Sequence, residues 1–204
     1  METFLFALCG YLIGSVPVAY LLARKRNGID LRKEGSGNVG ARNAYEVTGN
    51  KGLGFTVLLF DMLKGILPLI IVAGSGYCKM LPVVAVTIVL GHCYPVWLKF
   101  HGGRGLATGA AIAALIAPDS IACWVVVYLL SGFIRKQVHL QTLIATLICL
   151  IFTFVGYDSV HFFNIRFICQ GDKYLFQYSI VGILCIILSR HVQPVYELLI
   201  KKNA

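Results

Sequence analysis

Long apolar segments alternate with short polar segments along most of the chain. A membrane helix needs about 20 predominantly apolar residues. By this criterion the candidate spans are residues 3–23, 53–73, 81–98, 105–118, 120–134, 140–157 and 174–190. The pattern predicts an all-α polytopic membrane protein with seven transmembrane helices, several of them short. We expect residues 1–204 to form a single integral-membrane domain.

The fourth and fifth runs are short for complete membrane spans. They are separated by Ala117-Pro118-Asp119, which favours a tight turn between two helices. The alternative is that residues 105–134 form one span. The seven-span interpretation is favoured because it places residues 135–139 on the same side of the membrane as the loop after the first span.

Composition excludes two other classes of protein. Apolar residues make up 58% of the chain, charged residues make up 13%, and the mean hydropathy is +0.79. A soluble domain has about 25% charged residues, and a disordered chain is poor in apolar residues. Most of this chain is therefore expected to be surrounded by lipid.

The formal net charge is +9, and the seven-span arrangement puts most of the basic residues on one side. That side receives Arg24, Lys25, Arg26, Arg32, Lys33, Arg42, Lys51, Lys99, Arg104, Arg135, Lys136, Arg190, Lys201 and Lys202. Basic residues collect in cytoplasmic loops, so we expect the N-terminus outside and the C-terminus in the cytoplasm. The spread over four segments indicates a rim for acidic ligands or lipid headgroups and not a nucleic-acid surface.

A first candidate site is the glycine-rich segment 35–43, Gly-Ser-Gly-Asn-Val-Gly-Ala-Arg-Asn. Its G-x-G-x-x-G pattern is weak evidence for a dinucleotide site, because no strand precedes it. Closely spaced glycines let backbone N–H groups surround a phosphate, and a helix starting near Ala41 would add its dipole. Ser36, Asn38 and Asn43 offer further polar contacts. The alternative is a flexible, solvated turn.

A second candidate site is the segment 91–105. Gly102 and Gly103 permit close backbone approach, and Arg104 offers a fork of donors suited to phosphate. Lys99 is either a further cation at the site or a side chain that extends to the membrane interface. His92 is either a hydrogen-bond donor to substrate or a structural contact.

Two further pairs carry charge near or within the spans. Asp61 and Lys64 lie three residues apart on one helical face, and we interpret them as a mutual ion pair that fixes helix packing. Arg190-His191 ends the last run, where a positive charge also suits the helix dipole. The sequence contains no G-x-S-x-G elbow, no H-x-x-x-x-D pair and no Cys/His cluster with metal-ligand spacing. No metal ion and no organic cofactor is therefore expected.

In the order of these motifs the chain resembles the bacterial integral-membrane acyl-phosphate:glycerol-3-phosphate acyltransferases of the PlsY type. The matching motifs are Gly14-Ser15-Val16-Pro17, the segment 35–43, Asp61-Met62-Leu63-Lys64-Gly65, the segment 91–108 and Arg190-His191. The resemblance implies a seven-helix enzyme of the bacterial plasma membrane with its site facing the cytoplasm. Its substrates would be acyl phosphate and glycerol 3-phosphate, and its products lysophosphatidic acid and phosphate. The oligomeric state is left open.

The resemblance also implies roles for particular residues. Ser36, Arg104 and His191 are the expected catalytic residues, with Arg104 standing where the family usually has lysine. The expected substrate-binding residues are Gly37, Asn38, Gly40, Arg42, Asn43, His92, Lys99, Gly102 and Gly103. Since no carboxylate–histidine pair stands out, a phosphate oxygen of the substrate is expected to take the hydroxyl proton.

The chain departs from the family pattern at two places. Glu46 replaces a phosphate-binding arginine, and Arg42, one helical turn earlier, is expected to supply a guanidinium that Glu46 holds. Pro194 replaces the asparagine of the motif His-Arg-x-Asn. These departures suggest one alternative to the acyltransferase, a divergent paralogue that acts on another phosphorylated acceptor. A second alternative is a small transporter of anions or lipids that uses the same basic rim.

Overall fold

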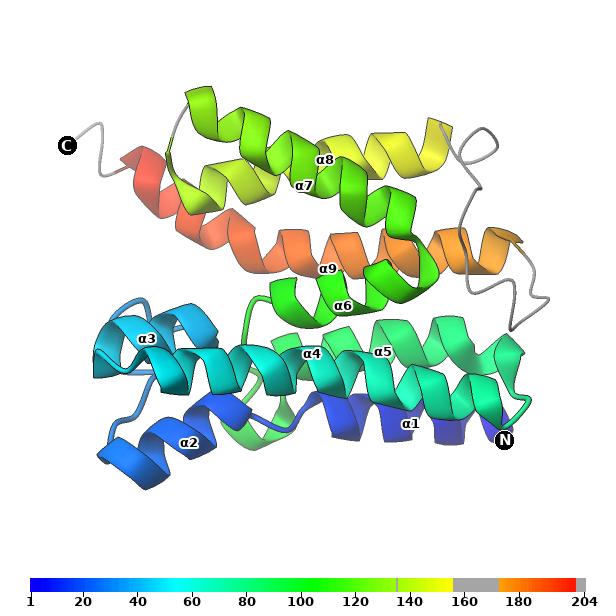
Figure 1. Cartoon of the computed structure of the whole chain (residues 1–204), viewed down its shortest axis with the longest axis horizontal. Helices are drawn as coiled ribbons and strands as arrows, with labels where there is room; N and C mark the ends of the chain where they lie inside the picture. Colours follow the sequence, from blue (N-terminus) through cyan, green and yellow to red (C-terminus); the bar gives the residue numbers. More distant parts are fainter. Residues whose placement is uncertain (135, 156–172, 201–204) are drawn as a thin grey trace.

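The computed structural model describes residues 1–134, 136–155 and 173–200, and the regular structure in these ranges is entirely helical. The α-helices, shown in Figure 1, are α1 (Glu2–Gly14), α2 (Val18–Asn27), α3 (Ala41–Thr48), α4 (Lys51–Gly74), α5 (Leu81–Cys93), α6 (Leu106–Ile116), α7 (Pro118–Ile134), α8 (Val138–Val155) and α9 (Lys173–Ile200). Two 3₁₀ turns, Cys78–Met80 and Val96–Leu98, flank α5. The predicted all-α class is confirmed.

The apolar runs fold as helices, with two differences from the prediction. The first run is interrupted at residues 15–17, between α1 and α2, and α9 continues past Arg190-His191 to Ile200, so these two residues do not lie at a helix C-terminus. In the described ranges, five helical segments are long and apolar enough to cross a membrane: Glu2–Asn27, Lys51–Gly74, Cys78–Leu98, Val138–Val155 and Tyr174–Leu198. The other two, α6 and α7, are shorter. The predicted turn between them is confirmed, because α6 ends at Ile116 and α7 begins at Pro118, where a proline suits the first helical position.

Most of the helices pack around one core cluster, and a second, smaller cluster joins α2, α3 and the start of α4. In Figure 1, α1, α4 and α5 form one side, α7, α8 and α9 form the other, and α6 lies between them. Helix α5 is central because it packs on both α1 and α9. Its Leu81 and Ile88 are fully buried beside Ile112 of α6 and Ile183 of α9. This core, to which α4, α5, α6, α8 and α9 contribute, holds the two sides together.

Glycines allow the closest contact in the core, between α1 and α5. A Cβ atom on Gly14 would collide with the carbonyl of Ile88, and one on Gly91 would collide with the carbonyl of Tyr11. The two backbones therefore approach without side chains between them, as is common where membrane helices associate.

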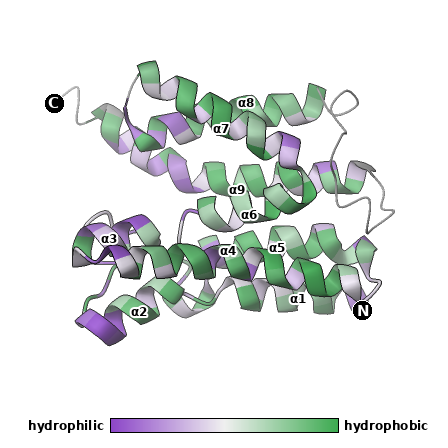
Figure 2. Ribbon diagram, in the orientation of Figure 1, coloured by the Kyte–Doolittle hydropathy of each residue, from purple (hydrophilic) through white to green (hydrophobic). Residues whose placement is uncertain are grey.

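Polar residues gather at one end of the bundle. Figure 2 shows hydrophilic residues on the C-terminal part of α2, on α3 and on the C-terminal part of α9, whereas the other parts of the long helices are mostly hydrophobic. Large apolar side chains are exposed on their outer faces, among them Phe60, Ile71 and Ile151. Such exposed apolar surface is expected where lipid replaces water.

Candidate active site

Two adjoining cavities lie at the polar end of the bundle. The apolar cavity has a volume of about 390 Å³ and runs between α6, α7, α8 and α9. The polar cavity has a volume of about 320 Å³, and its lining includes Ser36 and Lys136. Arg42, Arg104 and His139 line both cavities. A cationic junction therefore connects a polar compartment to an apolar one.

Asn43 organises the glycine-rich loop that enters the polar cavity. Its Oδ1 atom accepts from the backbone N–H of Ser36 at 2.9 Å, and its Nδ2 donates to the carbonyls of Leu31, Glu34 and Asn38 at 3.2, 3.1 and 2.9 Å. The side chain is buried. Because these bonds occupy both ends of the amide, Asn43 shapes the loop and places Ser36. Asn43 also lines the polar cavity, and its contact with substrate stays a prediction.

The same loop leads into the N-terminus of α3, as the sequence predicts. Gly35 and Gly37 have φ angles of +59° and +67°, which glycine adopts without steric cost. Helix α3 begins at Ala41 after Gly40, which has no side chain to cap the first-turn N–H groups. Gly40 and Ala41 line the apolar cavity. Free N–H groups and the positive end of the dipole therefore lie beside the junction, where they favour an anion.

Glu46 holds Arg42 on the surface of α3. The Arg42 Nε atom lies 2.7 Å from Glu46 Oε1, one helical turn away. Both side chains are largely exposed, so the pair adds little to stability. The expected contact between the two residues is confirmed, and it orients a guanidinium that lines both cavities.

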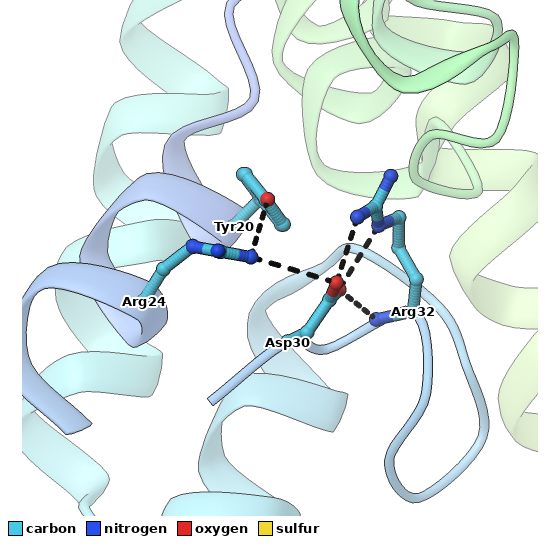
Figure 3. Close-up of polar contacts among 4 residues, drawn as sticks. All are labelled: Tyr20, Arg24, Asp30 and Arg32. Carbon is cyan, nitrogen blue, oxygen red and sulfur yellow. Dashed lines mark hydrogen bonds and ion pairs between the residues drawn. The ribbon is translucent and has the colours of Figure 1, made fainter. Parts of the chain in front are cut away.

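An anchor of Tyr20, Arg24, Asp30 and Arg32 fixes the chain before the glycine-rich loop (Figure 3). Arg32 donates to both carboxylate oxygens of Asp30, at 2.9 and 2.7 Å, and Arg24 donates to the Tyr20 hydroxyl at 3.0 Å. The Arg32 guanidinium also lies 4.9 Å from the centre of the Tyr20 ring. Hydrogen bonds from Arg32 hold the pKa of Asp30 at about 2, below its usual 3.8.

The backbone groups of Gly102 and Gly103 form hydrogen bonds within the protein. The N–H groups of Gly102 and Gly103 donate to the carbonyls of Cys93 and His92 at 3.2 and 3.1 Å. Their own carbonyls accept from Arg190, whose Nη2 lies 3.1 Å from Gly102 O and whose Nε lies 3.2 Å from Gly103 O. These glycines therefore position the next residue, Arg104, and their N–H groups are not available to a phosphate.

Arg104 is half-buried at the junction between the two cavities. Burial lowers the pKa of its guanidinium, and the positive charges of Arg190 and Arg42 lower that pKa further. Each of these effects penalises the charged form. An anion bound at the junction would offset the repulsion, so the arrangement favours binding of a negatively charged group.

A buried charge cluster supports the site from α4. The Lys64 Nζ atom lies 2.7 Å from Asp61 Oδ1, which confirms the predicted ion pair, and it also donates to the Val16 carbonyl at 3.2 Å. The same Oδ1 atom of Asp61 lies 3.5 Å from His92 Nδ1, and the Asp61 carbonyl accepts from the Thr108 hydroxyl at 2.9 Å. The cluster ties α4 to the break between α1 and α2, to α5 and to α6.

Unpaired polar atoms mark the inside of the apolar cavity. Among the described residues, the buried side-chain atoms without a hydrogen-bond partner are Asn38 Oδ1, His139 Nδ1 and His191 Nε2. All three residues line the apolar cavity. Buried polar atoms are normally paired, so this coincidence points to a polar ligand at this place.

The structure brings together most of the residues that the sequence singled out. Ser36, Asn38, Gly40, Arg42, Asn43, His92, Arg104 and His191 line one or both cavities. The described lining residues do not include Gly37, Lys99, Gly102 or Gly103. Lys99 is exposed, with a left-handed φ of 52°.

The sequence did not predict three polar residues that line the polar cavity, Lys136, Gln137 and His139. Lys136 was one of the basic residues on the inner side, but nothing distinguished it from the others. His139 begins an apolar run without any motif, and its neighbour in space, His191, lies on a different helix, with 5.7 Å between the ring centres.

Comparison with known proteins identifies the family to which the chain is similar. Residues 4–201 match the family model described as glycerol-3-phosphate acyltransferase. Glycerol-3-phosphate acyltransferase 2 of Thermotoga maritima is 37% identical over 162 residues, which cover 78% of this chain and 82% of that protein. The glycerol-3-phosphate acyltransferase of Gluconobacter oxydans is 44% identical over 139 residues, which cover 66% and 65% of the two chains.

Solved structures of the integral membrane glycerol 3-phosphate acyltransferase PlsY have the same fold. Its glycerol 3-phosphate form aligns with a TM-score of 0.76 at 31% identity, covering 98% of this chain and 94% of that one. Its lysophosphatidic acid form aligns with the same TM-score at 28% identity, covering 98% and 93%.

Proposed function

The chain belongs to the glycerol-3-phosphate acyltransferase family, and we propose that acyl phosphate is its acyl donor. The protein is an acyltransferase of phospholipid synthesis that acylates glycerol 3-phosphate to lysophosphatidic acid. The fatty acyl group would pass from acyl phosphate to the sn-1 hydroxyl, with release of inorganic phosphate.

One observation carries the proposal: Ser36 and Arg104 line the same polar cavity, and Arg104 also lines the apolar cavity beside it. Arg42, Arg104 and Lys136 give the polar cavity three cations for phosphate. The apolar cavity suits an acyl chain, whose burial contributes about 0.8 kcal/mol per methylene. The acyl carbonyl and the acceptor hydroxyl then meet at the junction.

In the proposed reaction the sn-1 oxygen attacks the acyl carbonyl carbon. An ester C–O bond forms, the bond from the acyl carbon to the phosphate oxygen breaks, and its electron pair leaves with the phosphate. Arg104, Ser36 and the first-turn N–H groups of α3 stabilise the negative charge that grows on the leaving group. A substrate phosphate oxygen takes the hydroxyl proton, and the cavities hold both substrates in line. No step requires a cofactor.

We also propose that α6 and α7 cross the membrane as short helices, which gives seven spans. The gathering of hydrophilic residues at one end of the bundle (Figure 2) supports a cytoplasmic position for the site, with the N-terminus outside and the C-terminus inside. In a bacterial cell the enzyme would lie in the plasma membrane. Residues 135, 156–172 and 201–204, which carry part of the charge on which this orientation depends, lie outside the described residues.

The direct test uses the purified protein with palmitoyl phosphate and labelled glycerol 3-phosphate. We expect labelled lysophosphatidic acid, and we expect Ser36→Ala and Arg104→Ala each to reduce turnover by about 100-fold. His101→Phe serves as a control, because His101 is exposed and outside the cavity linings. Product formed only with a thioester donor would contradict the choice of acyl phosphate, and normal turnover in both variants would contradict the assignment of the site.

A further inference from the structure

His139 is the group at the junction whose role the proposed reaction leaves unexplained. It is the second residue of α8, and it lines both cavities. Its Nδ1 atom is buried and has no hydrogen-bond partner among the described residues. A neutral imidazole has one donor and one acceptor nitrogen, so an unpaired ring nitrogen here favours a ligand with a polar group of its own.

The junction otherwise offers mainly donors. Arg42 and Arg104 carry N–H groups only, and they suit phosphate oxygens. A hydroxyl group both donates and accepts. A neutral imidazole can accept from it as well as donate to it, whereas a guanidinium can only donate. Two histidines, His139 and His191, lie next to each other here, with ring centres 5.7 Å apart.

The two histidines differ in the cavity that they reach. His191 lines the apolar cavity, whereas His139 also lines the polar one. The His191 Nδ1 atom lies 2.9 Å from the Ile187 carbonyl. Since a carbonyl only accepts, Nδ1 of His191 carries a proton, and Nε2 of the neutral ring is an acceptor.

The sequence of compartments, from the cations of the polar cavity through the junction to the apolar cavity, matches the order of the chemical groups along glycerol 3-phosphate. The phosphate belongs with the cations of the polar cavity, the reacting sn-1 hydroxyl belongs beside the acyl carbonyl in the apolar cavity, and the secondary hydroxyl lies between them. Among the described residues that line both cavities, His139 is the one whose side chain can accept from a hydroxyl as well as donate to it. We propose that His139 binds the secondary hydroxyl of the acceptor and thereby sets the specificity for a phosphorylated polyol.

This inference rests on the proposed function, and the test separates the two. The wild-type protein is assayed with palmitoyl phosphate and either glycerol 3-phosphate or 3-hydroxypropyl phosphate, which keeps the phosphate and a primary hydroxyl but lacks the secondary one. We expect kcat/KM to be about tenfold higher for glycerol 3-phosphate than for 3-hydroxypropyl phosphate. A tenfold ratio corresponds to the net contribution of one hydrogen bond. If no lysophosphatidic acid forms at all, the proposed function fails before His139 is tested.

The variant His139→Phe removes the polar atoms and keeps an aromatic ring of similar size. We expect kcat/KM for glycerol 3-phosphate to fall about tenfold, while that for 3-hydroxypropyl phosphate changes little, so that the preference disappears. His139→Asn retains a donor and an acceptor and should restore part of the preference. His101→Phe, the same substitution outside the cavities, should leave it unchanged.

Three results would overturn the inference. One is a wild-type enzyme that uses both acceptors equally well. Another is a His139→Phe variant that keeps the tenfold preference. The third is an equal loss with both acceptors and an unchanged ratio, which would show that His139 supports the fold and does not contact the hydroxyl.

Discussion

The Nε atom of Arg190 donates to the Gly103 carbonyl at 3.2 Å, and its Nη2 atom donates to the Gly102 carbonyl at 3.1 Å. The last helix thus holds the segment that carries Arg104. A guanidinium forms this two-point contact, whereas a lysine ammonium lacks the planar fork.

Substitution of Arg190 should therefore impair catalysis without removing any side chain from the cavity linings. A charge-assisted hydrogen bond contributes about 1.5–3 kcal/mol, so loss of the bonds from Arg190 should let the segment that carries Arg104 move. We therefore expect Arg190→Ala to lower kcat by about tenfold. Arg190→Lys should recover only part of the activity. Steady-state kinetics with both substrates measure the effect, and full activity in Arg190→Ala would show that the contact is dispensable.

The pair of Asp61 and Lys64 leads to a prediction about stability. Removal of one partner of a buried ion pair costs about 3–5 kcal/mol, because the other charge is left uncompensated. We expect Asp61→Asn to lower the unfolding temperature in detergent by several degrees. The double variant Asp61→Asn/Lys64→Met removes both charges and should regain much of that loss. A double variant no more stable than Asp61→Asn would argue against the ion pair as the cause.

The same pair shows why some features of the site were predictable from the sequence. Asp61 and Lys64 lie on one helix, so their spacing alone predicted the contact, as it did for Arg42 and Glu46. The apolar runs similarly predicted the helices, since their length reflects the thickness of the bilayer. Local periodicity determines each of these features.

Contacts between distant segments were not predictable in this way. Asn43 was a candidate ligand by its chemistry, but its loop-shaping bonds depend on how residues 31–38 fold around it. The role of Gly102 became visible only with Arg190 placed beside it. His139 belongs to the site because α8 and α9 bring it next to His191, and no motif in the sequence records that packing.

The carboxylate of Asp30 gives the anchor in Figure 3 a defined pH dependence. Its pKa is about 2 in the folded protein, below the usual 3.8. A lowered folded-state pKa means that the stabilisation is fully present above pH 3.8 and is lost as the pH falls toward 2. We expect Asp30→Asn to unfold at a lower temperature than the wild type at pH 6, and the difference to shrink between pH 4 and pH 2. A constant difference over that range would contradict the assignment.

Trp124 lines the part of the apolar cavity that extends away from the junction. Along α8 the lining runs from His139 to Cys149, and along α9 from His191 to Ile180. At a rise of 1.5 Å per residue these distances are both about 15 Å. Trp124 lines the cavity with Cys149 and Ile180, and its Nε1 donates to Thr146 Oγ1 at 3.1 Å.

This placement predicts that Trp124 limits the length of the acyl chain. An extended chain advances about 1.2 Å per bond, so 15 Å accommodates about a dozen carbons. The hydrogen bond and stacking on Tyr128, with ring centres 5.0 Å apart, hold the indole in place. We expect Trp124→Ala to raise kcat/KM for stearoyl phosphate relative to dodecanoyl phosphate by about fourfold for each extra methylene buried. Trp97→Ala, at an exposed tryptophan outside the cavity linings, should leave the ratio unchanged. An unaltered ratio in Trp124→Ala would mean that the chain leaves the cavity before it reaches the indole.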